Sequence, residues 1–183
     1  RPRRGEYFLA LGAGAEAVAY EISGRGFEVV IRVEAGGKPL KAIAGILPMY
    51  EDKKIDGLRI SVMPKYQLVD ELPMDFRRKN DILIQLSRLL ASKGYATPEV
   101  MNERNVGIYT MRDGTRVAGV FDPGSQGSML LSRDTSDART RGIMDTLGTM
   151  KVDNPWVAVW NEQETDIRRD IAQRGGDLRA SAR

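Results

Sequence analysis

The sequence contains no cysteine and no histidine, and these two absences exclude several classes of function. Without cysteine there are no disulfides, no thiolate nucleophile and no iron–sulfur ligation. Without histidine, Ser-His-Asp and Cys-His catalysis and most zinc sites are excluded. Any catalysis must therefore rely on carboxylates, arginine, lysine, tyrosine or a metal held by oxygen ligands.

Long apolar runs are also lacking, since none approaches the about 20 residues that cross a bilayer. The start Arg1-Pro2-Arg3-Arg4 leads into a strand-like segment and not into the apolar core of a signal peptide. We therefore expect no membrane span, no secretion and a cytoplasmic location. Because the first residue is Arg and not Met, we expect the encoded protein to begin further upstream.

The length and composition suit one globular domain. The chain has 183 residues, of which 42% are hydrophobic and 29% charged, so it can bury a core without help. We predict a single domain over residues 1–183. The net charge of +3 is a mild cationic bias that by itself indicates nucleic acid only weakly.

Alternating apolar residues predict strands in the N-terminal third. Residues 18–23 and 27–34 alternate on either side of Gly24-Arg25-Gly26 and form a predicted β-hairpin. Residues 40–47 predict a further strand, residues 51–57 a polar loop, and residues 58–63 another strand. The segment from Leu9 to Ala17 also fits the G-x-G-x-x-A dinucleotide fingerprint, followed by Glu34. A cofactor helix has no room after it, so we expect Gly12 and Gly14 to be strand or turn residues that bind no NAD or FAD.

Helical spacing begins at Asp75, with Ile82, Leu86, Leu89 and Leu90 on one stripe and Gly94 at the end. A second hairpin is predicted for residues 106–111 and 116–121, because Asp113-Gly114 is a tight-turn dipeptide. A second helix is expected to begin near Asp134 or Thr135, either of which can cap it.

The C-terminal part of the chain is predicted to contain a strand and a peripheral tail. Residues 156–160 alternate Trp-Val-Ala-Val-Trp, which is typical of a strand with both tryptophans on one face. Residues 161–183 are expected to form a charged tail, either a peripheral helix or partly disordered at its end. The predicted fold is of the α+β class, a mixed sheet with N-terminal β-hairpins and two or three helices.

The segment from Asp122 to Arg141 combines small residues, a helix start and several charges. Glycines permit a close backbone approach, and a helix N-terminus offers unpaired N–H groups to a phosphate. The predicted phosphate contacts here are Gly124, Ser125, Gly127 and Arg133. The alternative is a flexible connection with a normal helix cap and solvated arginines.

Carboxylates and arginines in the same segment are the candidate catalytic residues. Mg²⁺ or Mn²⁺ could be held by Asp122, Asp134 and Asp137. A carboxylate or the metal would activate water, and arginine would stabilise a phosphoryl transition state. If the segment is helical from Asp134, then Asp134, Asp137 and Arg141 share one face. The predicted catalytic residues are Asp134, Asp137, Arg139 and Arg141.

A second basic cluster, Arg77, Arg78 and Lys79, precedes the leucine stripe and is the predicted DNA-binding group. Its contacts would be to phosphates, and binding should therefore depend on salt more than on base sequence. The alternative is a solvated face, since Asp70, Glu71 and Asp75 lie close by in the chain.

Residues 85–100 combine a short helical pattern with Gly94 and Pro98, and Arg116-Val117-Ala118-Gly119 follows as a returning strand. This order of helix, glycine, proline and strand resembles that of the ParB/sulfiredoxin superfamily. The resemblance covers residues 58–145 and implies a ParB/sulfiredoxin-like fold with a nucleotide site at Gly119. In this chain Val120 and Phe121 stand where the family has acidic and arginine residues. The lack of cysteine excludes the thiol chemistry of a sulfiredoxin reductase.

The chain starts with Arg-Pro-Arg-Arg-Gly-Glu-Tyr-Phe. This start, the size of the chain and its lack of cysteine are also similar to plasmid fertility-inhibition proteins of the oncogenic-suppression type. That resemblance implies a bacterial protein with ATPase and DNase activity that blocks DNA transfer through a type IV secretion system. ATP, DNA and components of the secretion apparatus would then be its ligands and partners. The alternative is a non-catalytic inhibitor that binds DNA or a secretion-system protein and acts by occupancy.

Overall fold

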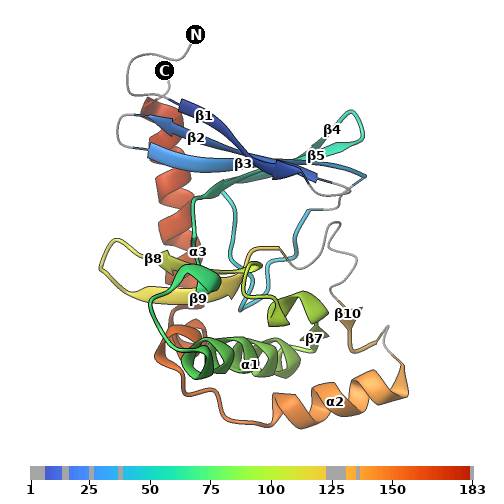
Figure 1. Cartoon of the computed structure of the whole chain (residues 1–183). Helices are drawn as coiled ribbons and strands as arrows, with labels where there is room; N and C mark the ends of the chain where they lie inside the picture. Colours follow the sequence, from blue (N-terminus) through green and yellow to red (C-terminus); the bar gives the residue numbers. More distant parts are fainter. Residues whose placement is uncertain are drawn as a thin grey trace. The chain divides into compact units, whose positions relative to one another are not determined.

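The computed structural model describes residues 7–13, 17–24, 27–36, 39–122, 131–134 and 137–181. These residues form two compact units, each of which is discontinuous in sequence. The first contains residues up to 40, residues 48–65 and the chain from Arg168 onward, and the second contains residues 41–47 and 66–167. The α+β class is confirmed, with helices and antiparallel sheets both present (Figure 1). The prediction of one domain over the whole chain stays a prediction.

The first unit is built on a five-stranded antiparallel sheet (Figure 1). Its strand order is β1-β2-β3-β5-β4, in which the elements are β1 (Tyr7–Ala13), β2 (Ala17–Gly24), β3 (Phe27–Ala35), β4 (Glu51–Ile55) and β5 (Leu58–Pro64). The predicted β2–β3 hairpin is confirmed, and its apolar positions face each other as Val18 with Val33 and Ile22 with Val29. The alternating apolar residues in the sequence therefore correspond to side chains on one face of the sheet.

Gly12 lies within β1, opposite Ala19 of β2, just after an irregularity in the strand register. The chain continues into a strand over residues 17–24 and not into the helix that a dinucleotide fold requires. The strand interpretation of this segment is thus confirmed. Gly14 lies outside the described residues.

Two predictions in the first half of the chain are wrong. Residues 51–55, predicted as a polar loop, are strand β4, and Asp56-Gly57 supplies the two left-handed residues of a tight hairpin turn. Residues 40–47, predicted as a strand, form none apart from a single bridge between Ile46 and Val120. β4 was missed because an exposed edge strand carries polar residues, whereas residues 43–47 are apolar because they are buried.

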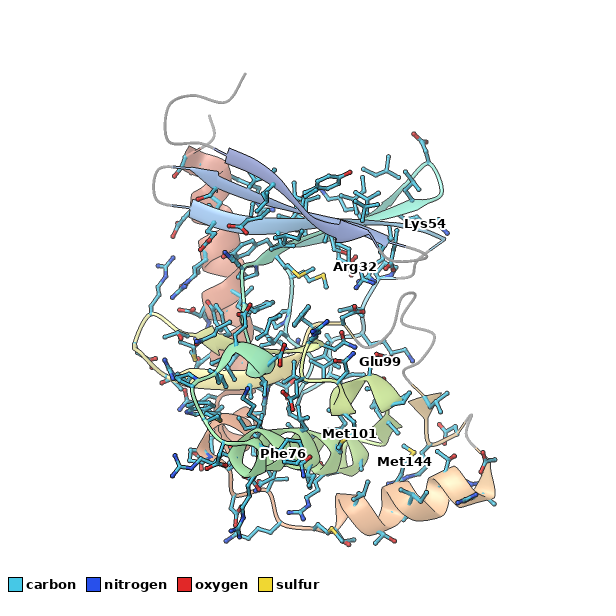
Figure 2. The ribbon with its side chains drawn as sticks, viewed as in Figure 1. Arg32, Lys54, Phe76, Glu99, Met101 and Met144 are labelled. Atoms are coloured by element: carbon cyan, nitrogen blue, oxygen red, sulfur yellow. The ribbon has the colours of Figure 1, made fainter. Side chains whose placement is uncertain are left out.

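A buried cluster of charges lies in the first unit. Arg59 on β5 and Glu34 on β3 are each 2% exposed, and the Arg59 guanidinium lies 3.0 Å from Glu34 Oε1. Arg59 also donates two hydrogen bonds to Asp52, at 2.7 and 2.9 Å. Arg32, on the same strand as Glu34, lies 3.1 Å from the other Glu34 oxygen (Figure 2). Burial lowers the pKa of Arg59, but the hydrogen bonds to Asp52 and Glu34 outweigh it and raise the pKa above its usual value.

The second unit contains two small sheets and most of the helices. Strands β6 (Gln67–Leu68), β8 (Val106–Thr110) and β9 (Arg116–Val120) form one sheet, and β7 (Tyr95–Ala96) pairs with β10 (Leu131–Ser132). The helical elements are η1 (Val69–Glu71), α1 (Phe76–Ser92), η2 (Pro98–Met101), α2 (Ala138–Gly148) and the start of α3 (Pro155–Ser181). The predicted hairpin at Asp113-Gly114 is confirmed as β8–β9.

Helix α1 forms as predicted and is the centre of this unit. Its leucine stripe is buried, with Leu86, Leu89 and Leu90 fully inaccessible. Gly94 follows the helix with φ of +83°, a conformation that ends a helix and favours glycine. Helix α2 packs against α1, and Met144 of α2 is 1% exposed.

One prediction in the C-terminal third is wrong, and another is confirmed only in part. Residues 156–160 are not a strand but the first turns of α3, because Pro155 occupies the first helical position and Asn154 accepts a hydrogen bond from Trp156 N. The predicted tail is helical, as the rest of α3, but its Ile167 and Ile171 are fully buried and not peripheral. In the part of the chain that the structure describes, no helix is long and apolar enough to cross a membrane.

Candidate functional site

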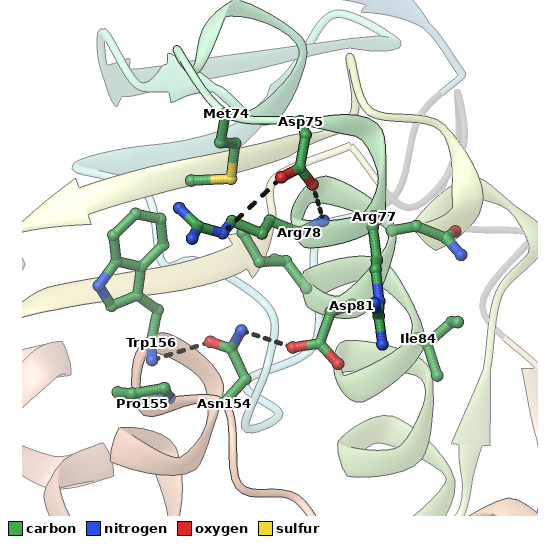
Figure 3. Close-up of a pocket in the computed structure, with 11 residues that line it drawn as sticks. Met74, Asp75, Arg77, Arg78, Asp81, Ile84, Asn154, Pro155 and Trp156 are labelled. Carbon is green, nitrogen blue, oxygen red and sulfur yellow. Dashed lines mark hydrogen bonds and ion pairs between the residues drawn. The ribbon is translucent and has the colours of Figure 1, made fainter.

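A pocket of about 980 Å³ lies beside the first turns of α1 (Figure 3). One wall is made by residues between Met74 and Ile84, and the other by Asn154, Pro155 and Trp156. All of these residues belong to the second unit. Two of the three predicted DNA-binding residues, Arg77 and Arg78, line this pocket.

The start of α1 positions the arginines. Asp75 is the N-cap, and its carboxylate accepts a hydrogen bond of 2.9 Å from Arg78 N. The Arg78 guanidinium is 77% exposed and lies 3.9 Å from Asp75, which makes a weak surface ion pair. Arg77 is exposed and has no ion pair with any residue that the structure describes. Lys79 turns away, because its ammonium donates to the carbonyl of Asp70 at 2.6 Å.

Gln85 of α1 holds the opposite wall in place. Its side chain is buried, and its amide oxygen accepts hydrogen bonds of 2.7 Å from both Asp153 N and Asn154 N. Its amide nitrogen donates to Asp153 Oδ1 at 2.8 Å and to Asp81 Oδ1 at 3.1 Å. One buried side chain thus joins a helix to a loop almost 70 positions away in the sequence.

The carboxylates at the pocket are engaged by neighbouring protein groups. Besides the bond from Gln85, Asp81 accepts a hydrogen bond of 2.9 Å from Asn154 Nδ2 (Figure 3). Hydrogen bonding from Gln85 and the nearby charge of Lys151 lower the pKa of Asp153 despite its partial desolvation. Asp75 and Asp81 therefore stabilise the walls of the pocket through hydrogen bonds, whereas the guanidinium groups of Arg77 and Arg78 stay accessible to solvent.

Trp156 contributes the aromatic surface of the pocket. The residue is half-buried in the first turn of α3, and the Arg116 guanidinium lies 5.3 Å from the centre of its ring. Trp160, one turn later, is instead buried in the core and donates a hydrogen bond of 2.8 Å to Ala118 O. The two rings are one helical turn apart, but Trp156 lies at the pocket whereas Trp160 is buried in the core.

Three residues of the site were not predicted from the sequence: Asn154 and Trp156, which line the pocket, and Gln85, which holds one of its walls. A usable signal was present for two of them, since Asn154-Pro155 is a typical start of a helix and places Trp156 in its first turn. No local pattern indicates that Gln85 is buried, because that depends on the arrival of a distant loop.

The predicted phosphate and catalytic segment is only partly within the described residues. Asp122, Arg133 and Asp134 are described, whereas Gly124, Ser125 and Gly127 lie outside. Arg133 N donates to Gly94 O at 2.8 Å, and the Arg133 guanidinium forms an exposed ion pair of 3.1 Å with Asp145. These contacts secure the chain beside the end of α1.

The expected helix begins later than predicted, and its cap is Asp137 and not Asp134 or Thr135. Asp137 accepts a hydrogen bond of 2.9 Å from Thr140 N, and α2 starts at Ala138. Asp134 therefore lies outside the helix, and the proposed helical face shared by Asp134, Asp137 and Arg141 is wrong. Arg139 and Arg141 are exposed residues of the first turn of α2.

Hydrogen bonding from Thr140 lowers the pKa of Asp137. Such a carboxylate is ionised at neutral pH and is a weaker base than one whose pKa lies near 7. Across the described ranges, no three acidic side chains gather into a group that could hold a metal. Asp122, Asp134 and Asp137 therefore do not fit a Mg²⁺ or Mn²⁺ site as an assembled ligand set, and their predicted roles stay predictions.

Gly119 lies in the middle of β9, in a buried position. A Cβ atom there would come within 2.6 Å of Leu47 Cγ, and it would also approach the backbone oxygen of Gly45. The space that the missing side chain of Gly119 leaves is thus occupied by the side chain of Leu47. Its predicted role in nucleotide binding stays a prediction.

We expect Asp137→Ala to lower the melting temperature at neutral pH, because the helix cap of α2 is lost. Since the pKa of Asp137 is lowered on folding, this contribution is present above its unfolded pKa and disappears as the pH falls through the folded pKa. Thermal unfolding followed by circular dichroism at about pH 7 and about pH 2 measures the difference. Asp134→Ala is the control, and equal effects from both variants would contradict the cap assignment.

Comparisons with known proteins identify no family. No family model and no curated protein matches the chain. Among solved structures, the Rio2 kinase–ADP/Mg²⁺–phosphoaspartate complex from Chaetomium thermophilum aligns with a TM-score of 0.46 and 11% identity, over 98% of this chain and 72% of that one. A likeness of this size carries no argument about shared function.

Proposed function

We propose that the protein binds DNA at the pocket beside α1 and acts by occupying the DNA. The observation that carries this proposal is the pair Arg77 and Arg78, which line a pocket of about 980 Å³ with exposed guanidinium groups. Arginine forms charge-assisted hydrogen bonds with phosphate. Its guanidinium group is more weakly hydrated than the ammonium group of lysine, so removing its water costs less free energy. The two guanidinium groups would contact successive phosphates of a DNA backbone.

The biological setting of the proposal is inhibition of plasmid DNA transfer through a type IV secretion system. It is supported by the resemblance of the chain's start and size to fertility-inhibition proteins. Occupancy of the transferred DNA would be sufficient for such an effect, and it needs only the binding surface. ATP hydrolysis and DNA cleavage, which the resemblance also implies, stay predictions from the sequence.

The basic pair is tested by DNA affinity across a salt series. Replacing both arginines, Arg77→Ala/Arg78→Ala, should weaken binding about tenfold at low salt and should reduce the slope of log K against log salt by about 2, because two phosphate contacts are lost. Fluorescence anisotropy with two unrelated labelled sequences gives both quantities. Similar affinities for the two sequences are expected.

The matched control is Lys53→Ala/Lys54→Ala, which removes two adjacent exposed cations from β4 (Figure 2). It lowers the net charge by the same amount, and we expect nearly unchanged affinity. Equal losses in the two double variants would indicate attraction by net charge alone. A strong base-sequence preference with little dependence on salt would also contradict the proposal.

A further inference from the structure

We propose that the pocket accepts an unpaired nucleobase, so that the DNA bound by this protein is single-stranded. This inference rests on the proposed function, because it assigns the form of DNA that the same pocket binds. It is carried by the combination, in one cavity, of an aromatic ring with the two accessible guanidinium groups (Figure 3).

The shape of the site favours a base over a backbone alone. A duplex presents its phosphates on a convex surface, and its bases are stacked and paired. Phosphate contacts to a duplex need only exposed cations and no concave surface. Here Arg77 and Arg78 line a cavity whose walls also include Met74, Ile84 and Pro155. The lining is mixed, with apolar side chains that can contact the faces of a base and polar side chains that can bind its edges and its phosphate.

Trp156 is the residue best suited to contact that base. Aromatic side chains bind single strands because every base has a face that can stack, whatever its identity. Trp156 lines the pocket, whereas Arg116, which lies 5.3 Å from its ring centre, is not part of the lining. A guanidinium against the indole restrains the ring from outside the pocket.

The ring is also held from the backbone side. Asn154 accepts a hydrogen bond of 3.1 Å from Trp156 N, and Gln85 accepts one of 2.7 Å from Asn154 N. The position of Trp156 therefore follows from a buried side chain of α1, the helix that also carries both arginines. A pre-formed arrangement of this kind loses little conformational entropy when a ligand binds.

An unpaired base with a phosphate occurs in a strand and in a free nucleotide, and we commit to the strand. The pocket is not an enclosed cavity, so a bound strand could continue beyond it. Further phosphates of a strand add salt-dependent affinity that a mononucleotide lacks. ATP should therefore compete with a single strand only weakly.

The experiment compares a labelled 20-nucleotide single strand with the duplex of the same sequence, and adds ATP as competitor. Trp156→Ala should weaken single-strand binding about tenfold and leave duplex binding nearly unchanged, since loss of one stacked base has an effect of this size. Trp156→Phe should retain most of the affinity because it keeps an aromatic face. Quenching of tryptophan fluorescence by the single strand should be present in the native protein and largely lost in Trp156→Phe.

The matched control is Phe76→Ala, which removes an aromatic ring 74% exposed beside the same arginines but outside the pocket lining. It should leave the single-strand preference intact. Circular dichroism melting shows whether each variant is folded. If Trp156→Ala does not fold, the fluorescence quenching of Trp156→Phe still tests the contact between Trp156 and the strand.

The possible failures are distinguishable. If the native protein binds neither form of DNA, the proposed function is wrong. The native protein could instead bind both forms with equal affinity, in a way that depends on Arg77 and Arg78 and that Trp156→Ala leaves unchanged. That result would support the proposed DNA-binding function and overturn the inference about an unpaired base. Displacement of the strand by ATP at similar concentration would identify a nucleotide site instead.

Discussion

Replacing Arg59 with methionine is expected to lower the free energy of unfolding by about 3–5 kcal/mol, because it leaves buried carboxylates without their main partner. Arg59 and Glu34 are each 2% exposed, and the side chain of Asp52 is only 16% exposed. Methionine fills similar space but supplies none of the three hydrogen bonds to Glu34 and Asp52. Urea unfolding followed by far-ultraviolet circular dichroism measures the loss.

Two controls separate the buried ion cluster from simple loss of a side chain. Arg104→Met breaks an ion pair of 3.5 Å with Asp70 in which Arg104 is 78% exposed, and it should change stability by less than about 0.5 kcal/mol. The double variant Arg59→Met/Glu34→Gln should lose less than the sum of the single variants, because removing one partner already strands the other. Additive losses would show that the two side chains are not coupled.

Replacing Trp160 with alanine is expected to lower the free energy of unfolding by about 3–5 kcal/mol, since it leaves a large cavity in the second unit. The Trp160 side chain is 1% exposed and lies within a core that includes residues of β9. Trp160→Phe should lose less, because it retains most of the ring while giving up the hydrogen bond to Ala118 O.

The neighbouring tryptophan is the natural control for this prediction. Trp156 lies one turn earlier in α3 and is half-buried, so Trp156→Ala should destabilise the protein much less than Trp160→Ala. Chemical unfolding of both variants under the same conditions gives the comparison. Equal losses would contradict the difference in burial between the two rings.

Local patterns predicted the elements whose partners are close in sequence. The β2–β3 and β8–β9 hairpins pair residues across short turns, and their alternation and turn residues agree. Helix α1 combines an N-cap, a leucine stripe and a terminal glycine, which all indicate the same element. The basic cluster at its start, Arg77, Arg78 and Lys79, was recognised because its residues are consecutive in the sequence.

The wrong predictions share a different cause. β4 has polar residues because it lies at the edge of its sheet, and Trp-Val-Ala-Val-Trp fits a helix as well as a strand because its two tryptophans are four residues apart. The N-cap of α2 is Asp137, although Asp134, three positions earlier, is the same residue type and could serve as a cap equally well. Where two structures fit one pattern equally, long-range packing decides between them.

The amino-acid order alone determined the excluded chemistries, the α+β class and the cluster of arginines at the start of α1. Only the tertiary structure decided that those arginines line a pocket with Trp156, because Gln85 must first bind the loop at Asp153 and Asn154. It likewise decided that Arg59, Glu34 and Asp52, which lie on three different strands, form one buried cluster. Helix and hairpin signals arise from neighbours in the chain, whereas burial and charge pairing arise from segments that meet only when the chain folds.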